Sequence, residues 1–580
     1  MRLAIYMAVV GVLHALHCDK EFSYYDSYGN GFDIVCQGIT VEHLHLLQNI
    51  TITNEITLRM EDCSLIGVSS KIFHNVDSIR YLYVENSTFT YPRLSSVFEV
   101  LQKLEHLIIR NTNLLVDKYT FAGLTKLKEL TLNNNSLAEM EDGSLRNLPS
   151  LMHLQLTNNE ITDLKNIPLC ELRKLRLLDL SKNLISRLND ATFFCRKSSK
   201  SVGFNLNNQN HLLNNLNKED YFTESITSKL QYIDLSYNNI SELGSALADL
   251  KNLKILHLEK NKLRKIEYKE LKALESLEKV YLRNNLLESV DKNIFSNQKN
   301  LEYLDLSNNR LVYFSLNVTP LLEHINLADN MLDMFNLDNG NDTSHLKTLI
   351  LCSNRIRDIQ PFAFRRHEAF EHLSIANNNI IELPPFVFRN LTNLKILNLS
   401  LNRIKVFKSN NTFLDLINLE VLNISYNLLE ELNYALIEPL ANLQVLDIAG
   451  NRLHHIQYDL IISDLPLLSV FNLKSNMLSC ELLHKIIKFL KGKSIGYTIT
   501  ENFDYEQENV GGIHCSSEKN VVPDKLTRDS ISSGSYAVIV LGGILGLVLG
   551  LILIVVSLFK IHMFLKRRLY KADEFELIDE

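Results

Sequence analysis

Residues 253–263 read Leu-Lys-Ile-Leu-His-Leu-Glu-Lys-Asn-Lys-Leu, and their spacing, Leu-x-x-Leu-x-Leu-x-x-Asn-x-Leu, decides the fold. The same frame returns along most of the chain. Its clear copies begin at Leu127, Leu151, Leu175, Leu230, Leu253, Leu277, Leu301, Leu346, Leu394, Leu419 and Leu443. A period of about 24 residues over so many copies indicates a repeat architecture, in which each unit buries its apolar face only by stacking on its neighbours.

The asparagine occurs once in each repeat, so its positions give the number of units. The matching positions are Cys63, Ser87, Thr112, Asn135, Asn159, Asn183, Gln209, Asn238, Asn261, Asn285, Asn309, Asn330, Asn354, Asn378, Asn402, Asn427, Asn451 and Asn476. They predict about eighteen units. Two intervals are irregular, because Gln209 and Asn238 lie 29 residues apart and Asn309 and Asn330 only 21. We expect residues 195–229 to bulge outward, as a plain insertion or as a source of ligand contacts.

Within each unit the alternation x-Leu-x-Leu predicts one short parallel strand, with the leucines inward and the other side chains on the concave face. The asparagine side chain is expected to bond the backbone of neighbouring turns, as a ladder that satisfies buried polar groups. A recurrent phenylalanine is expected in the convex-side core and not in a ligand site. The residues concerned are Phe73, Phe121, Phe193, Phe295, Phe364, Phe388 and Phe413.

From about residue 55 to residue 478 this frame resembles the extracellular leucine-rich-repeat family. The resemblance implies an α/β repeat solenoid, a horseshoe with a parallel sheet on its concave face. Toll-like receptors, adhesion proteins and insect immune proteins use such a face to recognise proteins. The divergent N-terminal cap, many short repeats and small tail are similar to membrane-bound leucine-rich immune proteins of insects such as mosquitoes. The C-terminal cap departs from the family pattern, because Cys480 is followed by an amphipathic stretch, 481–491, and only Cys515 beyond it.

The two ends of the chain predict a single-pass membrane protein. Arg2 and the apolar run 3–16 have the pattern of a signal peptide, and a short anchor is the alternative. Residues 536–559 contain no charge and basic residues follow at once, which predicts a type I protein of the plasma membrane with its N-terminal part outside. We expect this division: 1–17 signal peptide, 18–54 N-terminal cap, 55–478 repeats, 479–515 C-terminal cap, 516–535 juxtamembrane linker, 536–559 transmembrane helix, and 560–580 cytoplasmic tail.

Two motifs near the C-terminus suggest contacts through the membrane and in the cytoplasm. Gly542, Gly546 and Gly550 share one helix face and predict helix association, although glycine is common in membrane helices. Asp573, Leu577 and Ile578 resemble an acidic dileucine sorting signal, and a generic acidic end is the alternative. The tail is too short for a folded signalling domain.

The cysteine positions suggest three disulfide bridges. Cys18 with Cys36 would close the N-terminal cap, and Cys480 with Cys515 the C-terminal cap. Cys170 and Cys195 have nearly the same phase in adjacent turns, so they form either a bridge or two buried free thiols. Cys63 and Cys352 are expected to remain unpaired.

Ten Asn-x-Ser/Thr sequons predict glycosylation of a translocated chain, although the repeat frame itself produces some of them. They are Asn49, Asn86, Asn134, Asn239, Asn317, Asn341, Asn390, Asn398, Asn410 and Asn423. Asn398 and Asn423 take the same concave position in consecutive turns, where a glycan would obstruct the face.

Charge and motifs exclude several function classes. The net charge of -7, from 60 basic and 67 acidic residues, provides no basic field for nucleic acid. No zinc motif, nucleophile elbow, phosphate loop or kinase signature occurs. His43 and His45 lack further metal ligands and are expected at the surface. We therefore expect no enzyme activity, no cofactor and no metal site.

The outward strand positions in the middle of the repeats combine rings with charges, which is typical of a protein-binding surface. These candidate ligand-binding residues are Tyr232, Asp234, His257, Glu259, Tyr281, Arg283, Tyr303, Asp305 and His324. The alternative is that tyrosine simply favours strands. Further on, an apolar row of Ile396, Val421, Val445 and Val470 either forms a dimer contact or packs along the strands.

These patterns predict a cell-surface receptor or co-receptor, with a possible place in innate immunity, that binds an extracellular protein or microbial ligand and signals through a partner. Homo- or heterodimers would form through the ectodomain and the membrane helix. The alternative is a cell-adhesion protein that binds similar ectodomains on neighbouring cells.

Overall fold

The computed structural model describes residues 18–22, 32–43 and 57–515, except 94–95, 142, 170–171, 189–192, 194–228, 318, 339–343, 362 and 500–507. Contacts divide the chain into residues 1–517 and 518–580, and all described residues belong to the first unit. The predicted signal peptide, juxtamembrane linker, transmembrane helix and tail lie outside the described residues, as do Gly542, Gly546, Gly550, Asp573, Leu577 and Ile578. Among the described residues, no helix combines the length and apolar character that crossing a membrane requires.

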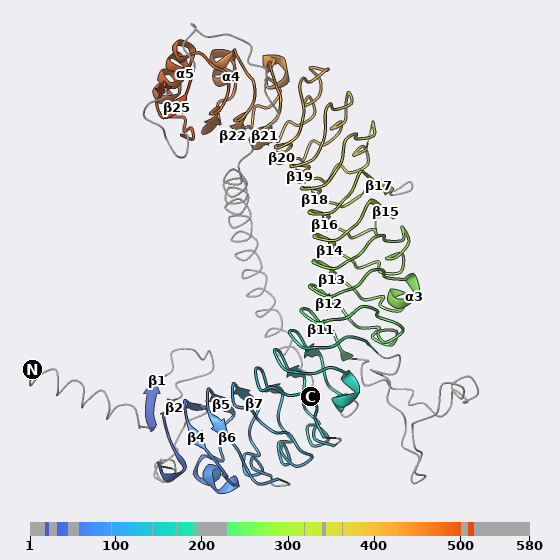
Figure 1. Ribbon diagram of the computed structural model, residues 1–580, viewed down its shortest axis with the longest axis vertical. Helices are drawn as coiled ribbons and strands as arrows, with labels where there is room; N and C mark the ends of the chain where they lie inside the picture. The colour runs from blue at the N-terminus through green and yellow to red at the C-terminus, as the bar shows by residue number, and fades with distance from the viewer. Residues whose placement is uncertain are drawn as a thin grey trace, which may run out of the picture. The chain divides into compact units, whose positions relative to one another are not determined.

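One large sheet of nineteen strands runs through the described residues, with its strands along one side of the ribbon and the turns along the other (Figure 1). In spatial order the strands are β1 (Cys18–Phe22), β2 (Phe32–Gln37), β3 (Thr57–Glu61), β5 (Tyr81–Glu85), β7 (His106–Arg110), β8 (Glu129–Thr131), β9 (His153–Gln155), β10 (Leu177–Asp179), β11 (Tyr232–Asp234), β12 (Ile255–His257), β13 (Lys279–Tyr281), β14 (Tyr303–Asp305), β16 (His324–Asn326), β18 (Thr348–Ile350), β19 (His372–Ser374), β20 (Ile396–Asn398), β21 (Val421–Asn423), β22 (Val445–Asp447) and β23 (Val470–Asn472). β1 pairs with β2 antiparallel, and each later neighbour is parallel.

Shorter elements occupy the turns and the C-terminal end. The strand pairs are β4 (Ser64–Leu65) with β6 (Thr88–Phe89), β15 (Tyr313–Asn317) with β17 (Met334–Asp338), and β24 (Asn509–Val510) with β25 (Ile513–His514). The α-helices are α3 (Tyr268–Leu271), α4 (Tyr458–Asp464) and α5 (Cys480–Gly492). The 3-10 helices are η2 (Val41–His43), η3 (Ser70–Val76), η4 (Leu164–Asn166) and η8 (Tyr434–Leu436).

The leucines of the repeat frame form the core, as the sequence predicts. In the repeat of β12, Leu253, Leu256, Leu258 and Leu263 are all fully buried. The seven recurrent phenylalanines are buried too, and those of successive turns stack, with ring centroids 6.1 Å apart between Phe364 and Phe388 and between Phe388 and Phe413. Each turn therefore presents apolar surface that only its neighbours can cover.

The predicted asparagine ladder is present and connects successive turns. The side-chain amide of Asn261 donates to the carbonyls of Leu235 in the preceding turn and Leu258 in its own turn, at 2.9 and 3.1 Å. Its Oδ1 accepts a bond from the amide of Ile240 at 2.9 Å. The same three bonds recur around Asn285. One buried side chain thus satisfies three buried backbone groups.

Gln209, to which the sequence assigns a repeat, lies outside the described residues. β10 pairs directly with β11, with Leu178 opposite Ile233. The ladder also passes directly across, because Asn238 donates to the carbonyl of Leu180 at 3.0 Å. The described sheet therefore has no strand between β10 and β11, and the predicted unit there is wrong.

The structure differs from the predicted repeat pattern at two other places. β2 lies in the predicted N-terminal cap, yet it pairs with β3 as the first parallel strand of the stack. The short interval from Asn309 to Asn330 contains β15, an extended strand in a region where most repeats have turns. Extended backbone covers about 3.3 Å per residue, so fewer residues are needed to complete that turn.

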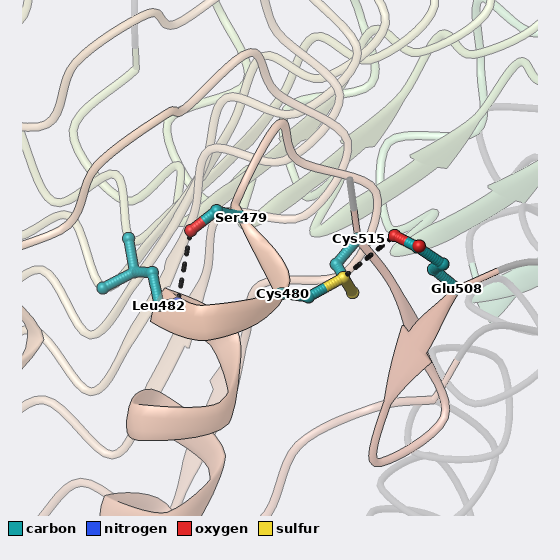
Figure 2. Close-up of a disulfide and its surroundings, with 5 residues drawn as sticks. All are labelled: Ser479, Cys480, Leu482, Glu508 and Cys515. Atoms are coloured by element: carbon teal, nitrogen blue, oxygen red, sulfur yellow. Dashed lines mark hydrogen bonds between the residues drawn. A yellow bond between two sulfur atoms is a disulfide. The ribbon is translucent and has the colours of Figure 1, made fainter. Parts of the chain in front are cut away.

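The C-terminal cap is formed by α5 and the β24–β25 hairpin. Ser479 begins the helix by accepting a hydrogen bond from the amide of Leu482 at 3.2 Å (Figure 2). Leu483, Ile486, Ile487 and Leu490 form the buried face that the amphipathic stretch predicts. Cys480 and Cys515 form a disulfide bond, shown in Figure 2, which ties the helix to the hairpin.

The remaining cysteines divide into three groups. Cys36 is disulfide-bonded, and Cys18 lies opposite it in the β1–β2 pair. The bond between these two cysteines remains a prediction. Cys170 and Cys195 lie outside the described residues. Cys63 and Cys352 are free thiols, as expected.

Candidate functional site

The candidate site consists of side chains on the face of the large sheet that points away from the leucine core. A three-residue strand buries its central side chain and turns the first and third outward, as in the Tyr-Ile-Asp of β11. The parallel register then aligns these outward positions from strand to strand. We call this surface the strand face.

The five predicted rings form one continuous row across β11 to β16. The centroid distances are 5.3 Å from Tyr232 to His257, 4.3 Å from His257 to Tyr281, 5.0 Å from Tyr281 to Tyr303 and 6.1 Å from Tyr303 to His324. The rings of His257 and Tyr281 are parallel within 4°. We call these residues the ring row. All five are half-buried, so each ring is held by its neighbours and still reaches solvent.

Three predicted carboxylates lie beside these rings. Asp234 accepts a bond from the amide of Ser236 at 2.8 Å and another from the Tyr232 hydroxyl at 3.4 Å. Asp305, only 7% exposed, accepts one from the amide of Ser307. Glu259 bonds the imidazole of His257 through Oε1 at 2.8 Å, whereas its Oε2 is buried and has no hydrogen-bond partner among the described residues.

Burial and mutual charge shift the acidity of these groups. Burial raises the pKa of Asp234 and of Asp305. It also raises the pKa of Tyr281 to about 12, with the charge of Glu259 adding to the effect. Burial alone would lower the pKa of His257, but the hydrogen bond to Glu259 and nearby carboxylates raise it overall. The site therefore favours positive charge at its centre.

Two basic residues complete the middle of the strand face. Arg283 is exposed at the position that the sequence predicts. Lys279 was missed by sequence reasoning. It is half-buried on β13, and the register places it opposite Tyr303. The rule of outward strand positions identifies it directly, because the first residue of each strand has the same orientation.

Sequence reasoning also missed a second cluster on the strand face, which we call the N-terminal cluster. Arg59 lies over the ring of Tyr83, with its guanidinium carbon 4.1 Å from the centroid. Tyr81 stacks on His106 at 4.5 Å, and His106 Nδ1 lies 3.0 Å from the carboxylate of Glu129. These repeats lack the asparagine that sets the frame, which obscured their outward positions. Arg110 adds an ion pair with Glu85 at 3.3 Å.

The predicted apolar row lies on β20 to β23. The register aligns Ile396, Val421, Val445 and Val470 at one strand position. Ile396 is 36% exposed and the three valines are half-buried. The row is therefore aligned along the sheet and remains partly open to solvent.

A polar groove of about 560 Å³ runs beside this row, where the strands begin. Its lining includes Lys347, Glu371, Lys395 and Glu420. Lys395 pairs with Glu371 at 2.8 Å and Lys347 with Glu323 at 2.7 Å, so both lysines of the groove have partners within the chain. Nothing in this arrangement favours one chemical class of ligand.

The sequons differ in accessibility. Asn86, Asn134, Asn390 and Asn410 are exposed, whereas Asn239, Asn398 and Asn423 are half-buried. Asn49 and Asn341 lie outside the described residues, and Asn317 is described only as backbone of β15. On the strand face, Asn398 and Asn423 each accept a bond from the backbone amide two residues further on, at 3.0 Å. Glycosylation at any of them remains a prediction.

Within the described residues, no group of three histidine, cysteine or acidic side chains is placed to hold a metal ion.

A family model described as Leucine rich repeat matches more than half of the chain. The matched segments are 102–161, 125–185, 149–202, 228–287, 275–332, 344–404, 368–429 and 409–453. The gap in these matches between residues 202 and 228 falls within the segment that separates β10 from β11.

Comparison with known proteins gives relatives of the same architecture. Mouse podocan is 35% identical over 114 residues, which are 19% of each protein. Human lumican is 30% identical over 297 residues, covering 48% of this chain and 74% of lumican. The solved complex of Drosophila Toll with Spätzle matches with a TM-score of 0.55 at 15% identity, over 83% of this chain and 71% of the matched one. The chain thus spans about a fifth of podocan, and its likeness to Toll is one of fold.

Proposed function

The chain belongs to the leucine rich repeat family, and on that premise we propose that its strand face binds an extracellular protein ligand through the ring row. The protein would act as a cell-surface receptor or co-receptor in innate immunity. It would signal through a partner recruited by its membrane segment.

The observation that carries this proposal is the continuity of the ring row. Five rings from five neighbouring strands contact one another in sequence, at centroid distances between 4.3 and 6.1 Å. A protein-binding hot spot needs large side chains that lose little entropy on binding, and mutually stacked rings on a paired sheet meet that need. The ring row therefore supports binding better than scattered tyrosines would.

The relatives support a protein as the ligand. Toll, which shares the fold, has been solved in complex with Spätzle. Among the described residues, the absence of a grouped metal site and the matched charges of the polar groove offer no competing chemistry. A microbial ligand would use the same rings, since stacking on an aromatic surface is not restricted to proteins.

The test is affinity capture with the soluble ectodomain, residues 18–530. Wild type, Tyr281→Ala and Tyr303→Ala would be compared with Tyr426→Ala, which removes an exposed tyrosine of the turn after β21. The ligand is the protein that wild type and Tyr426→Ala retain and that both ring-row variants release, with affinity reduced by about tenfold or more. If no captured protein depends on Tyr281 and Tyr303, the ring row is not the binding site.

Cell adhesion is the second candidate, and the apolar row favours it. Four aligned branched side chains with partial exposure would suit contact with a similar ectodomain. Cells expressing the full chain should then cluster, and Val421→Asp should abolish clustering without reducing surface expression. Clustering that is unaffected by Val421→Asp would exclude the apolar row.

A further inference from the structure

The surface around the ring row carries more acidic than basic side chains. Asp179, Asp234, Glu259, Glu278, Glu302 and Asp305 lie on or directly beside β10 to β14, against the basic Arg176, Lys254, Lys279 and Arg283. Among the described residues, neither Asp234 nor Asp305 has a lysine or arginine nitrogen within 4.0 Å. The charge of Arg283 reaches Asp305, but burial outweighs it and the pKa of Asp305 is raised.

The same shortage of positive charge is visible atom by atom. Asp234 and Asp305 have backbone amides and a phenol as hydrogen-bond donors, which are neutral groups. Glu259 shares one oxygen with His257, while its other oxygen is buried and has no partner. A half-desolvated carboxylate without a cation is costly, so a cation brought from outside would bind there with little competition from the chain.

The N-terminal cluster shows how the chain itself places basic side chains on such a surface. It combines tyrosines, histidine and carboxylates on the same strand face, but its cations belong to the chain. Arg59 covers Tyr83, Arg110 pairs with Glu85, and His106 pairs with Glu129. In the ring row only the His257–Glu259 pair corresponds to these contacts.

We infer that the ring row binds a basic segment of its partner protein, whose arginine or lysine side chains lie along the rings and bring their charges to Asp234, Glu259 and Asp305. The inference rests on the proposed function and names the chemistry of its ligand. The methylene groups of the ligand side chains would pack on the stacked rings, as long basic side chains do on apolar surfaces. An acidic segment is disfavoured by the same carboxylates.

The matched control for this inference is Asp447, on β22. It occupies the same strand position as Asp305, accepts the amide of Ala449 at 3.0 Å, and burial raises its pKa too. Its strand carries Val445 of the apolar row in place of a ring. Asp447→Asn therefore removes an equivalent charge at a place where no basic ligand is expected.

The experiment measures binding of a short unstructured arginine-rich peptide to the ectodomain, residues 18–530. Peptides with lysine, citrulline or glutamate at the arginine positions serve as comparisons, because citrulline keeps the shape of arginine without its charge. We expect the arginine and lysine peptides to bind and the other two not to bind. Glu259→Gln and Asp305→Asn should each weaken arginine-peptide binding by about fivefold or more, and Asp447→Asn should change it less than about twofold.

Three results would overturn the inference: no binding of the arginine peptide, equal binding of the citrulline peptide, or equal losses in Asp305→Asn and Asp447→Asn. The natural ligand separates this inference from the proposed function. If a protein captured through Tyr281 and Tyr303 is retained equally by Glu259→Gln and Asp305→Asn, the proposed function stands and the basic segment is wrong. If capture is independent of all four residues, both fail.

Discussion

The repeats of β3, β5 and β7 and those of β8 to β23 bury the same kind of leucine core, but they end their strands differently. β3, β5 and β7 have five residues each, and the strands of the large sheet from β8 to β23 have three. The ladder position holds Cys63, Ser87 and Thr112 in the first region, and asparagine in every repeat of the second.

We propose that the ladder side chain sets the length of backbone pairing. Asn261 donates to carbonyls of two successive turns and so takes the place of some strand-to-strand bonds, while the amide of Lys260 still donates to the carbonyl of Arg283 beyond β12. Ser87 has a shorter side chain, and its hydroxyl bonds only the amide of Cys63 and the carbonyl of Glu85. Backbone pairing therefore continues past the leucines, to Glu85 opposite Arg110. The change occurs at β7, which pairs over five residues with β5 and over three with β8.

The largest expected effect tests what the two regions share. Leu256→Asp and Leu82→Asp each place a charge at a fully buried position, so both should lose more than about 4 kcal/mol of stability and abolish secretion. Immunoblotting of the medium against cell lysate measures this, with the exposed Lys262→Asp as control. Normal secretion of either leucine variant would show that the inward frame is wrongly placed in that region.

A smaller effect should separate the regions. Asn261→Ala leaves three buried backbone groups without partners and should cost about 3 kcal/mol, whereas Ser87→Ala should cost about 1 kcal/mol. Urea unfolding of the secreted ectodomain gives both values. Equal losses would contradict the view that the asparagine ladder replaces backbone pairing.

The His106–Glu129 pair, at the boundary of the two regions, and the His257–Glu259 pair, within the second, should respond oppositely to pH. The hydrogen bond from His106 lowers the pKa of Glu129, so its contribution to stability is present above the unfolded-state pKa and is lost as pH falls through the lowered folded value. The raised pKa of His257 acts in reverse: its contribution is present below about 6.5 and is lost as pH rises through the folded value.

Unfolding midpoints of the wild type, Glu129→Gln and His257→Gln, measured from acidic pH to above neutral pH, check the direction of both pH effects. The first variant should flatten the acidic limb of the profile and the second the limb above neutral pH. A wild-type profile in either variant would show that the pair concerned adds nothing to stability.

The smallest expected effect concerns the boundary between the regions. Thr112→Asn would extend the ladder by one turn, with a stability change below about 1 kcal/mol. Hydrogen exchange should nevertheless be faster at the amide of Arg110, because the new side chain would compete for a carbonyl of the preceding turn at the end of β5, as Asn261 bonds Leu235. Unchanged exchange there would mean that strand length is set by the turns and not by the ladder residue.

Much of the fold could be predicted because the spacing of leucines fixes which side chains point inward. Leu256 and the ring row follow from that one rule, since the residues between inward leucines must face outward. Gln209 shows its limit: spacing tells which residues could enter the core, but not whether a segment pairs with its neighbours. The direct pairing of β10 with β11 is a long-range property that no local pattern contains.

The sequence was sufficient to predict where the site lies, but not which of its charged groups have partners. The outward positions of Tyr281 and Asp305 were visible in the sequence, whereas the unpartnered oxygen of Glu259 depends on side-chain conformation. Lys279 and the N-terminal cluster were accessible to the same rule. The latter was missed because Cys63, Ser87 and Thr112 do not present the asparagine that makes a repeat conspicuous.

The disulfide of the C-terminal cap has a mechanical consequence. Cys480 and Cys515 are 35 positions apart, so a pull on the chain beyond Cys515 passes through the sulfur atoms directly to the start of α5. The enclosed segment cannot lengthen, and the first element to bear the load is the last repeat, where β23 pairs with β22. Because each turn contacts only its neighbours, tension would peel the solenoid from this end in steps of one repeat, with the ring row among the later turns to open.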